Sequence, residues 1–395
     1  MGVASDILKL EPDAVIKPWG LRHGELWQAR RTAGVGELWL ASAQTGPDNF
    51  ASRIVEPPLG ITLAELLGQA AAEGEDELGR LIGPRGLAVL KASPHRGKTE
   101  AWVVREAQGR AGFVSGPRTF DQLARLEELV LEKAIGPDVT AWSAEVRDLL
   151  GVIEPVRGGE AFVVPCGTLH TMFAVGQESA LVIDEVQQGY GRSLLPTLSK
   201  ILMVQGSLLS LQVHPCDETV RQAAAGELKL GHDLEANPTV RVTDFGRRPG
   251  EEPGLGLSLV RLDGGLRRVT PVEVALAGGA RVGVLVACAH FVKSRLVLPP
   301  KAVCELRPLH GSYRVLHCVR GSVRIEADRS SRRVSAGETA FVPGRLESGL
   351  RLRAETDCEL LDDAVPDLAG LAEFLKEAGA SLGQIEALLR PPRAV

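Results

Sequence analysis

The chain lacks several features that mark particular classes of protein. Its six cysteines are scattered, with no C-x-x-C spacing, so we expect reduced thiols in a cytosolic protein. No window approaches the roughly 20 uninterrupted apolar residues that a membrane span requires. The first residues, MGVASDILKLEPDAV, carry acids where a signal peptide needs a basic region followed by an apolar run. These absences predict a soluble protein in the cytoplasm.

An excess of positive charge is also missing. Forty-five basic and fifty acidic side chains give a formal net charge of −5, which does not favour nucleic acid or an anionic membrane as a partner. The 395 residues, of which 44% are hydrophobic, are enough for two or three packed units. We therefore expect a globular protein with a small-molecule partner, as a monomer or homodimer.

Most of the chain consists of short apolar or alternating runs separated by glycine and proline, which indicates a mainly β scaffold. Helical spacing interrupts it at about 119–151, where Thr119 begins a T-x-x-Q capping box. Two further helices are expected at 366–395, the second beginning with a capping box formed by Ser381 and Gln384. The sequence therefore predicts a β protein with a small helical insert and C-terminal helices.

A weak internal repeat indicates how the strands are organised. The segment G-E-A-F-V-V-P at 159–165 recurs as G-E-T-A-F-V-P at 337–343. The same strand-turn unit used twice suggests two copies of one barrel. We therefore predict a catalytic domain at 1–265, a second barrel at 266–365 and terminal helices at 366–395.

The first copy continues as P-C-G-T-L-H and ends at His170. It resembles the second motif of cupins, in which a strand ends in a tight turn and a histidine points into a jelly-roll barrel. In the second copy the position equivalent to His170 is Ser348. The resemblance implies two cupin-type barrels, of which the C-terminal one holds no metal.

Two other segments are more specific. S-L-Q-V-H-P at 210–215 and G-K-T-E-A-W at 97–102 resemble the hallmark segments of type I mannose-6-phosphate isomerases, which are zinc-dependent cupins. The resemblance implies one zinc per chain, held by Gln212, His214, Glu100 and His170. Alternation along a strand puts Gln212 and His214 on the same face. A mixed nitrogen and oxygen ligand set suits a catalytic zinc with an open position.

Further matches point to the cations of the site. T-V-R-V-T-D-F-G-R at 239–247 resembles a family segment whose first arginine lies in the catalytic site, which corresponds to Arg241. Lys98, beside the ligand segment, and Lys200, at a strand end, are candidates for catalysis and phosphate binding respectively. Arg241 would also bind the anionic substrate. The alternatives are a surface salt bridge for Arg241 and simple solvation for Lys200.

The order of the segments differs from the family pattern. In the family the Q-V-H-P strand comes first, whereas here Glu100 and His170 precede Gln212 and His214. We interpret the block at about 190–238 as a transposed metal-binding hairpin. At its usual position stands only an apolar run, Leu87–Lys91, taken as a strand, followed by His95, which is expected in a loop and whose role as a ligand stays open.

The resemblance implies an enzyme that interconverts mannose 6-phosphate and fructose 6-phosphate through a zinc-stabilised cis-enediolate. The general base is not identified by the sequence. Two alternatives remain: a metal-dependent isomerase of another sugar, and a carbohydrate-binding sensor without turnover. Kinetics with phosphorylated and free sugars separate them.

Overall fold

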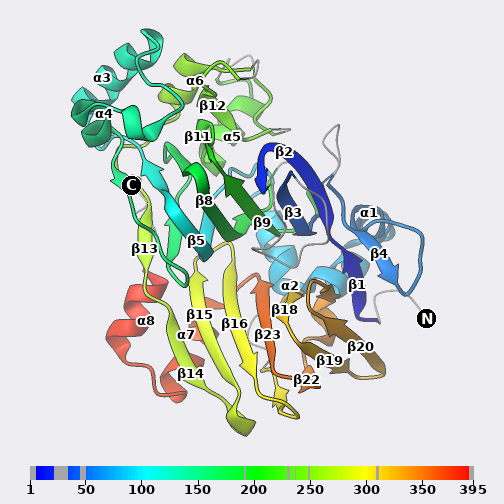
Figure 1. Cartoon of the computed structure of the whole chain (residues 1–395). Helices are drawn as coiled ribbons and strands as arrows, with labels where there is room; N and C mark the ends of the chain where they lie inside the picture. Colours follow the sequence, from blue (N-terminus) through cyan, green and yellow to red (C-terminus); the bar gives the residue numbers. More distant parts are fainter. Residues whose placement is uncertain are drawn as a thin grey trace.

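The computed structural model describes residues 6–21, 34–44, 50–190, 193–228, 232–235, 237–247, 250–307 and 311–390. Strands predominate over helices in these segments, and they pair antiparallel (Figure 1). The predicted mainly β, cupin-type fold is therefore confirmed. No helix in the described segments is both long and apolar enough to cross a membrane.

The largest sheet has 11 strands, seven of which form the path β13-β7-β5-β8-β9-β3-β2, with β6, β10, β11 and β12 paired beside it. Its strands are β2 (Asp13–Leu21), β3 (Val35–Ala41), β5 (Glu100–Ser115), β6 (Val152–Ile153), β7 (Ala161–Val164), β8 (His170–Gln188), β9 (Thr197–Gln205), β10 (Ser207–Leu208), β11 (Leu211–Val213), β12 (Val240–Thr243) and β13 (Arg267–Val269). This sheet positions the predicted site residues, with His214 one residue after β11 and Lys98 two residues before β5.

A second sheet of eight strands has the order β14-β15-β16-β23-β18-β21-β1-β4. Its strands are β1 (Leu8–Glu11), β4 (Arg53–Glu56), β14 (Val272–Ala275), β15 (Arg281–Ala287), β16 (Val292–Leu298), β18 (Arg314–Arg320), β21 (Thr339–Val342) and β23 (Cys358–Ala364). Strands β1 and β4 thus join a sheet made otherwise of C-terminal strands. The domain boundary near residue 265 stays a prediction, and the first strands of the chain do not follow it.

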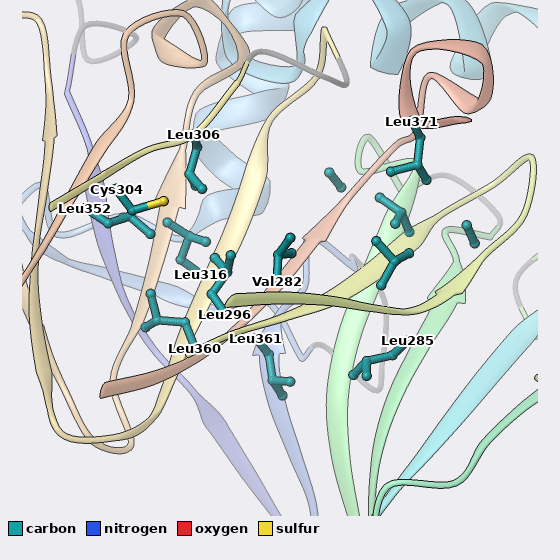
Figure 2. Packing of buried hydrophobic residues seen from close by; sticks show 14 of the residues in the cluster. Val282, Leu285, Leu296, Cys304, Leu306, Leu316, Leu352, Leu360, Leu361 and Leu371 are labelled. Carbon is teal, nitrogen blue, oxygen red and sulfur yellow. The ribbon is translucent and has the colours of Figure 1, made fainter. Parts of the chain in front are cut away.

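A third sheet, with the order β17-β22-β19-β20, consists of β17 (Val303–Glu305), β19 (Ser322–Ala327), β20 (Ser330–Ser335) and β22 (Arg351–Ala354). Leucine, valine and cysteine side chains from this sheet and the eight-stranded one fill the core between them, among them Leu296, Leu316, Leu352 and Leu360 (Figure 2). The interior of the C-terminal region is therefore largely apolar.

The structure contains the helices that the sequence predicts. The expected insert contains α3 (Phe120–Leu131) and α4 (Ala144–Leu149), and the C-terminal pair is α7 (Leu368–Glu377) and α8 (Leu382–Leu389), the last with the expected Ser381–Gln384 capping box. Short helices α5 (Asp217–Ala224) and α6 (Pro253–Ser258) flank β11 and β12. Figure 1 shows α3, α4 and α6 at the opposite end of the molecule from α7 and α8.

Two expectations are wrong. The run Leu87–Lys91 is not a strand but belongs to α2 (Glu75–Ala92), which follows α1 (Leu63–Glu73). Leu87 and Leu90 pack there against a core cluster that α1 also joins, so tertiary packing overrides a short apolar run. The cysteines are not all reduced either, because Cys166 and Cys216 form a disulfide with their Cα atoms 5.0 Å apart.

Candidate metal centre

The candidate site depends on a ribbon of two long strands that folds back on itself. In the pairing of β5 with β8, Glu100 lies opposite Gln187 at one end and Ser115 opposite His170 at the other. Both strands change register near Gly109 and Gly176, which adopt positive φ angles of 63° and 105°. Such angles favour glycine and allow a sharp bend.

The bend brings the two arms of the ribbon face to face. The Trp102 ring in the first arm lies 4.9 Å from Phe113 and 5.4 Å from His170, centroid to centroid, in the second arm. Since side chains alternate along a strand, Glu100 shares the inward face with Trp102. The residues at opposite ends of the ribbon, Glu100 and His170, therefore meet in space.

Three of the four predicted ligands form one buried cluster. Glu100, His170 and His214 are each 1–2% exposed, and one ligand atom from each lies within 4.8 Å of the others. His214 Nε2 is 3.2 Å and His170 Nε2 is 3.7 Å from the Glu100 carboxylate oxygens. Ligand atoms around a tetrahedral zinc at about 2.0–2.2 Å are separated by about 3.3–3.6 Å, so these separations fit such an ion.

The fourth predicted ligand, Gln212, is adjacent. It pairs with His170 in the register of β11 and β8, and its Nε2 atom is 3.4 Å from His170 Nε2. The amide can present its oxygen at that place if it is turned over, because the two amide atoms are distinguished only by their hydrogen bonds. The segment at 210–215 thus meets the other two ligand segments although it follows both in the chain.

Each histidine is oriented by a hydrogen bond from its Nδ1 atom, the ring nitrogen that faces away from the cluster. The Nδ1 atom of His170 donates to the Thr168 carbonyl at 2.8 Å, and that of His214 donates to the Pro238 carbonyl at 3.0 Å. Because a carbonyl only accepts, each ring carries its proton on Nδ1 and turns the lone pair of Nε2 inward. Burial, aided by the neighbouring His214, lowers the pKa of His170 to about 3, so this ring is neutral near pH 7.

The carboxylate of Glu100 is ionised. Burial alone would raise its pKa, but the adjacent Lys98 ammonium, with His214 and His170, holds that pKa well below the usual range. Lys98 forms a close ion pair with Glu100 and lies 3.5 Å from His214 Nε2. The Lys98 ammonium shows that this position accepts a cation. A set of one anionic and two neutral ligands there fits a divalent ion.

The predicted cations line the same cavity of about 300 Å³. Lys98 and Lys200 are buried, and Lys200 Nζ lies 3.2 Å from Glu185 and 4.8 Å from the centre of the Trp39 ring. Arg241, on β12, lies opposite Gln212 in the register. Within the described segments, no carboxylate forms an ion pair with the Arg241 guanidinium, so this cation remains available to a ligand.

Sequence reasoning missed Glu185. This side chain is 1% exposed, lines the cavity and lies opposite Trp102 in the pairing of β8 with β5. Burial, and secondarily the charge of Glu100, raises its pKa to about 7 despite the nearby Lys200. A glutamate within the apolar run L-V-I-D-E-V was the available signal, since an acidic side chain is seldom fully buried without either an ion-pair partner or a function.

His95, whose role as a ligand the sequence left open, lies outside the ligand cluster. His95 is 37% exposed, and its Nδ1 atom is 2.7 Å from Glu235, away from the ligand cluster. In the C-terminal region Ser348, the counterpart of His170, is exposed on the chain after β21. Among the residues that the structure describes, Glu100, His170 and His214 are the group of histidine, cysteine or acidic side chains arranged to hold an ion.

Comparison with known proteins gives a likeness in fold. No family model matches the chain, and no curated protein matches it by sequence. The solved mannose 6-phosphate isomerase from Bacillus subtilis superposes with a TM-score of 0.56 at 14% identity, over 91% of this chain and 100% of that one. A variant of the phosphomannose isomerase from Salmonella typhimurium and a zinc-bound mannose 6-phosphate isomerase each give 0.50 at 14% identity over the same shares.

At 14% identity these likenesses establish the architecture alone. The chain has the fold of mannose 6-phosphate isomerases, with a candidate Glu-His-His metal centre in the cavity of its largest sheet. What the centre does has to be argued from its residues.

Proposed function

We propose that the protein is a zinc-dependent aldose–ketose isomerase that interconverts mannose 6-phosphate and fructose 6-phosphate. The observation that carries the proposal is the meeting of Glu100, His170 and His214 in a cavity that is also lined by cationic side chains, among them Arg241. Their sequence segments, which resemble those of one isomerase family, lie far apart in the chain. Convergence of all three supports a shared ion better than three independent structural roles.

In this proposal Glu100, His170, His214 and Gln212 hold one zinc ion per chain. A bound zinc would supply Lewis-acid stabilisation of negative charge on the sugar oxygens at C1 and C2. The neutral histidines and the single carboxylate leave the ion with net positive charge, which that role requires. The burial of all three keeps bulk water from competing for the ligands.

Glu185 is the group best placed to move a proton between C2 and C1. Its pKa of about 7 makes it a base of useful strength at neutral pH, because the strongest general catalysis comes from groups that titrate near the working pH. Lys200, 3.2 Å away, orients the carboxylate and stabilises its ionised form. The proposal therefore assigns the base that the sequence left unidentified.

The cavity charge favours an anionic substrate. Its lining includes four cationic side chains (Lys17, Lys98, Lys200 and Arg241) and three carboxylates (Glu37, Glu100 and Glu185). Arg241 offers a planar fork of donors suited to a phosphate, whereas Lys98 and Lys200 act as buried point charges. With a divalent ion bound, the positive excess grows, and a phosphorylated sugar is preferred to a neutral one.

The test is turnover of the zinc-loaded protein with mannose 6-phosphate, followed through formation of fructose 6-phosphate. We expect Glu185→Gln to reduce kcat by about 10²- to 10⁴-fold while retaining zinc, as for loss of a general base. Free mannose should react far more slowly at equal concentration. Faster turnover of an unphosphorylated aldose would replace this substrate, and zinc binding without any turnover would favour a sensor.

A further inference from the structure

The disulfide between Cys166 and Cys216 lies at the point where the ligand segments meet. Cys166 belongs to the turn that leads from β7 to His170, and Cys216 follows His214 by two residues. The two half-cystines are 50 residues apart in the chain. The covalent bond therefore joins the segments that carry two of the candidate metal ligands.

Hydrogen bonds join the same segments. The Gly167 amide donates to the His214 carbonyl at 2.6 Å, directly beside the disulfide. On the other side, the Lys98 amide donates to the Pro215 carbonyl at 3.2 Å, and the Gly97 amide donates to the Asp217 carboxylate at 2.8 Å. Residues 214–217 thus contact both the segment that leads to Glu100 and the turn that leads to His170.

Close packing makes this junction sensitive to small displacements. A Cβ atom on Gly97 would lie 2.2 Å from the Pro215 carbonyl oxygen, and one on Gly167 would lie 2.5 Å from the Arg261 side chain. The Gly97 backbone therefore touches the Pro215 backbone, whereas Gly167 is covered by the Arg261 side chain. A shift of either segment would move the candidate ligand that it carries, Glu100 after Gly97 or His170 after Gly167.

We infer that the Cys166–Cys216 disulfide positions the histidines and that its redox state sets the affinity of the centre for zinc. Two unbonded sulfur atoms need more space than a bonded pair: the thiols of Cys318 and Cys358 in this chain lie 4.0 Å apart, against about 2.05 Å for a disulfide bond. If the two backbones take up even a quarter of that added sulfur separation, about 0.5 Å, the histidines leave the tolerance within which a site must hold its ligands. Reduction therefore weakens zinc binding.

The bond is open to reductants. Both half-cystines are partly exposed, whereas Cys318 and Cys358 are buried. Cys216 caps the N-terminus of α5, and Arg261 Nη1 lies 3.7 Å from its sulfur, although Arg261 also pairs with Asp263. The disulfide therefore lies where a reductant can reach it.

A dithiol reductant exchanges with this bond in two steps. One thiolate of the reductant attacks one of the two cysteine sulfurs, forms a mixed disulfide and releases the other cysteine as a thiolate, which takes up a proton. The second reductant thiolate then attacks the reductant sulfur of the mixed disulfide and releases the remaining cysteine. Two electrons and two protons pass to the protein, and the reductant becomes a disulfide.

The inference rests on the metal centre of the proposed function and not on sugar isomerisation. The test compares the zinc dissociation constant of the full chain, by chelator competition, before and after reduction with a water-soluble phosphine. The phosphine becomes its oxide with an oxygen from water and leaves two thiols. We expect about 10-fold weaker binding after reduction, restored on reoxidation, and a changed visible spectrum of the cobalt(II)-loaded protein.

Variants separate positioning from general stability. The double variant Cys166→Ser/Cys216→Ser should bind zinc like the reduced chain and not respond to the phosphine. Cys318→Ser, which changes a buried cysteine away from the site, should respond as the wild type does. Alkylation of the denatured chain should label four cysteines before reduction and six after it.

Three results overturn the inference. They are six reactive thiols without reductant, equal or tighter zinc binding after reduction, and a lowered Tm with unchanged zinc affinity. Absence of zinc binding by the oxidised wild type instead overturns the metal centre, and the proposed function with it. Zinc binding that responds to reduction in a protein without isomerase activity keeps the inference and rejects the proposed activity.

Discussion

The two copies of the Gly-Glu strand-turn unit end in different surroundings. The first, at 159–165, forms β7 and leads through a tight turn to the buried His170. The second, at 337–343, forms β21 and leads into a short 3₁₀ helix, Gly344–Leu346, after which Ser348 is exposed. A repeated unit thus fixes the course of the backbone, while the residue beyond the turn determines whether a ligand enters the interior.

The interiors differ in the same way. The cavity beside β5 and β8 is lined by charged and aromatic side chains, whereas the core beside β16 and β23 is mostly apolar (Figure 2). The cavity of about 520 Å³ in that region is likewise lined mainly by apolar side chains, with Arg314 and Asp362 among its few charged ones. Among the described residues of the C-terminal region, the buried acidic and basic side chains form compact ion pairs such as Lys293–Asp363 at 2.8 Å and Arg314–Glu347 at 3.3 Å. Charge that is fully paired holds a structure together, and charge left facing a cavity can act on a ligand.

The largest effect should come from removing a candidate metal ligand in the cavity beside β5 and β8. His214→Ala should weaken zinc binding by more than about 100-fold and abolish isomerase activity, because loss of a direct ligand exceeds the 10- to 100-fold cost of losing a supporting contact. Metal analysis after dialysis measures it. His317→Gln, at a buried histidine of the C-terminal region, is the matched control and should leave zinc content unchanged. Full zinc content in His214→Ala would contradict the ligand assignment.

A substitution in the C-terminal region should change the stability of the protein and not its metal binding. Lys293 is fully buried, and Asp363 also accepts from Ser199 of β9 at 2.7 Å, so this ion pair connects the two large sheets. Lys293→Met should lower the free energy of unfolding by about 3–5 kcal/mol, because a buried carboxylate is left unpaired. Urea denaturation measures the loss.

Zinc affinity of folded Lys293→Met should match wild type, since the pair lies outside the cavity lining. The double variant Lys293→Met/Asp363→Leu should recover most of the stability, because it removes the stranded charge as well. A double variant no more stable than the single one would show that the pair acts by geometry and not by charge.

A smaller effect is expected at Arg241. Arg241→Lys should lower kcat by about 10- to 100-fold with zinc content and Tm near wild type, because a lysine keeps the charge but not the planar fork of donors. Steady-state kinetics with mannose 6-phosphate measure it. Arg247→Lys, at a side chain already paired with Asp244, is the control. Normal turnover of Arg241→Lys would return this residue to a surface role.

The comparison also shows what the sequence can predict. The strands and the helical insert follow from alternation and helical spacing, whereas the convergence of Glu100, His170 and His214 is predicted from the resemblance of their segments to one isomerase family. The sharp bend of the β5–β8 ribbon does not, because two isolated glycines in long strands resemble ordinary turn residues. Glu185 carries no motif, and its role depends on burial beside Trp102. The Cys166–Cys216 pairing depends on a contact across 50 residues that spacing cannot reveal.

The smallest effect concerns the acid stability of the metal-free protein. A glutamate in the unfolded chain has a pKa near 4.5, whereas burial raises the pKa of Glu185 to about 7 in the folded chain. Between these values the folded protein retains a proton that the unfolded chain has released. The contribution of Glu185 to stability is therefore lost progressively as the pH rises from about 4.5 to about 7, and it is constant above that window.

Glu185→Gln removes this titration, so the variant should gain stability relative to wild type across the window. The depressed pKa values of His170 and His214 act in the opposite direction, but they are common to both proteins and cancel in the difference. Urea midpoints at pH 5, 6, 7 and 8 in the presence of a chelator measure it. Glu127→Gln, on the exposed face of α3, should show a constant offset. A difference between Glu185→Gln and wild type that does not change with pH would mean that Glu185 is already ionised at pH 5, and it would then be too weak a base for the proton transfer proposed here.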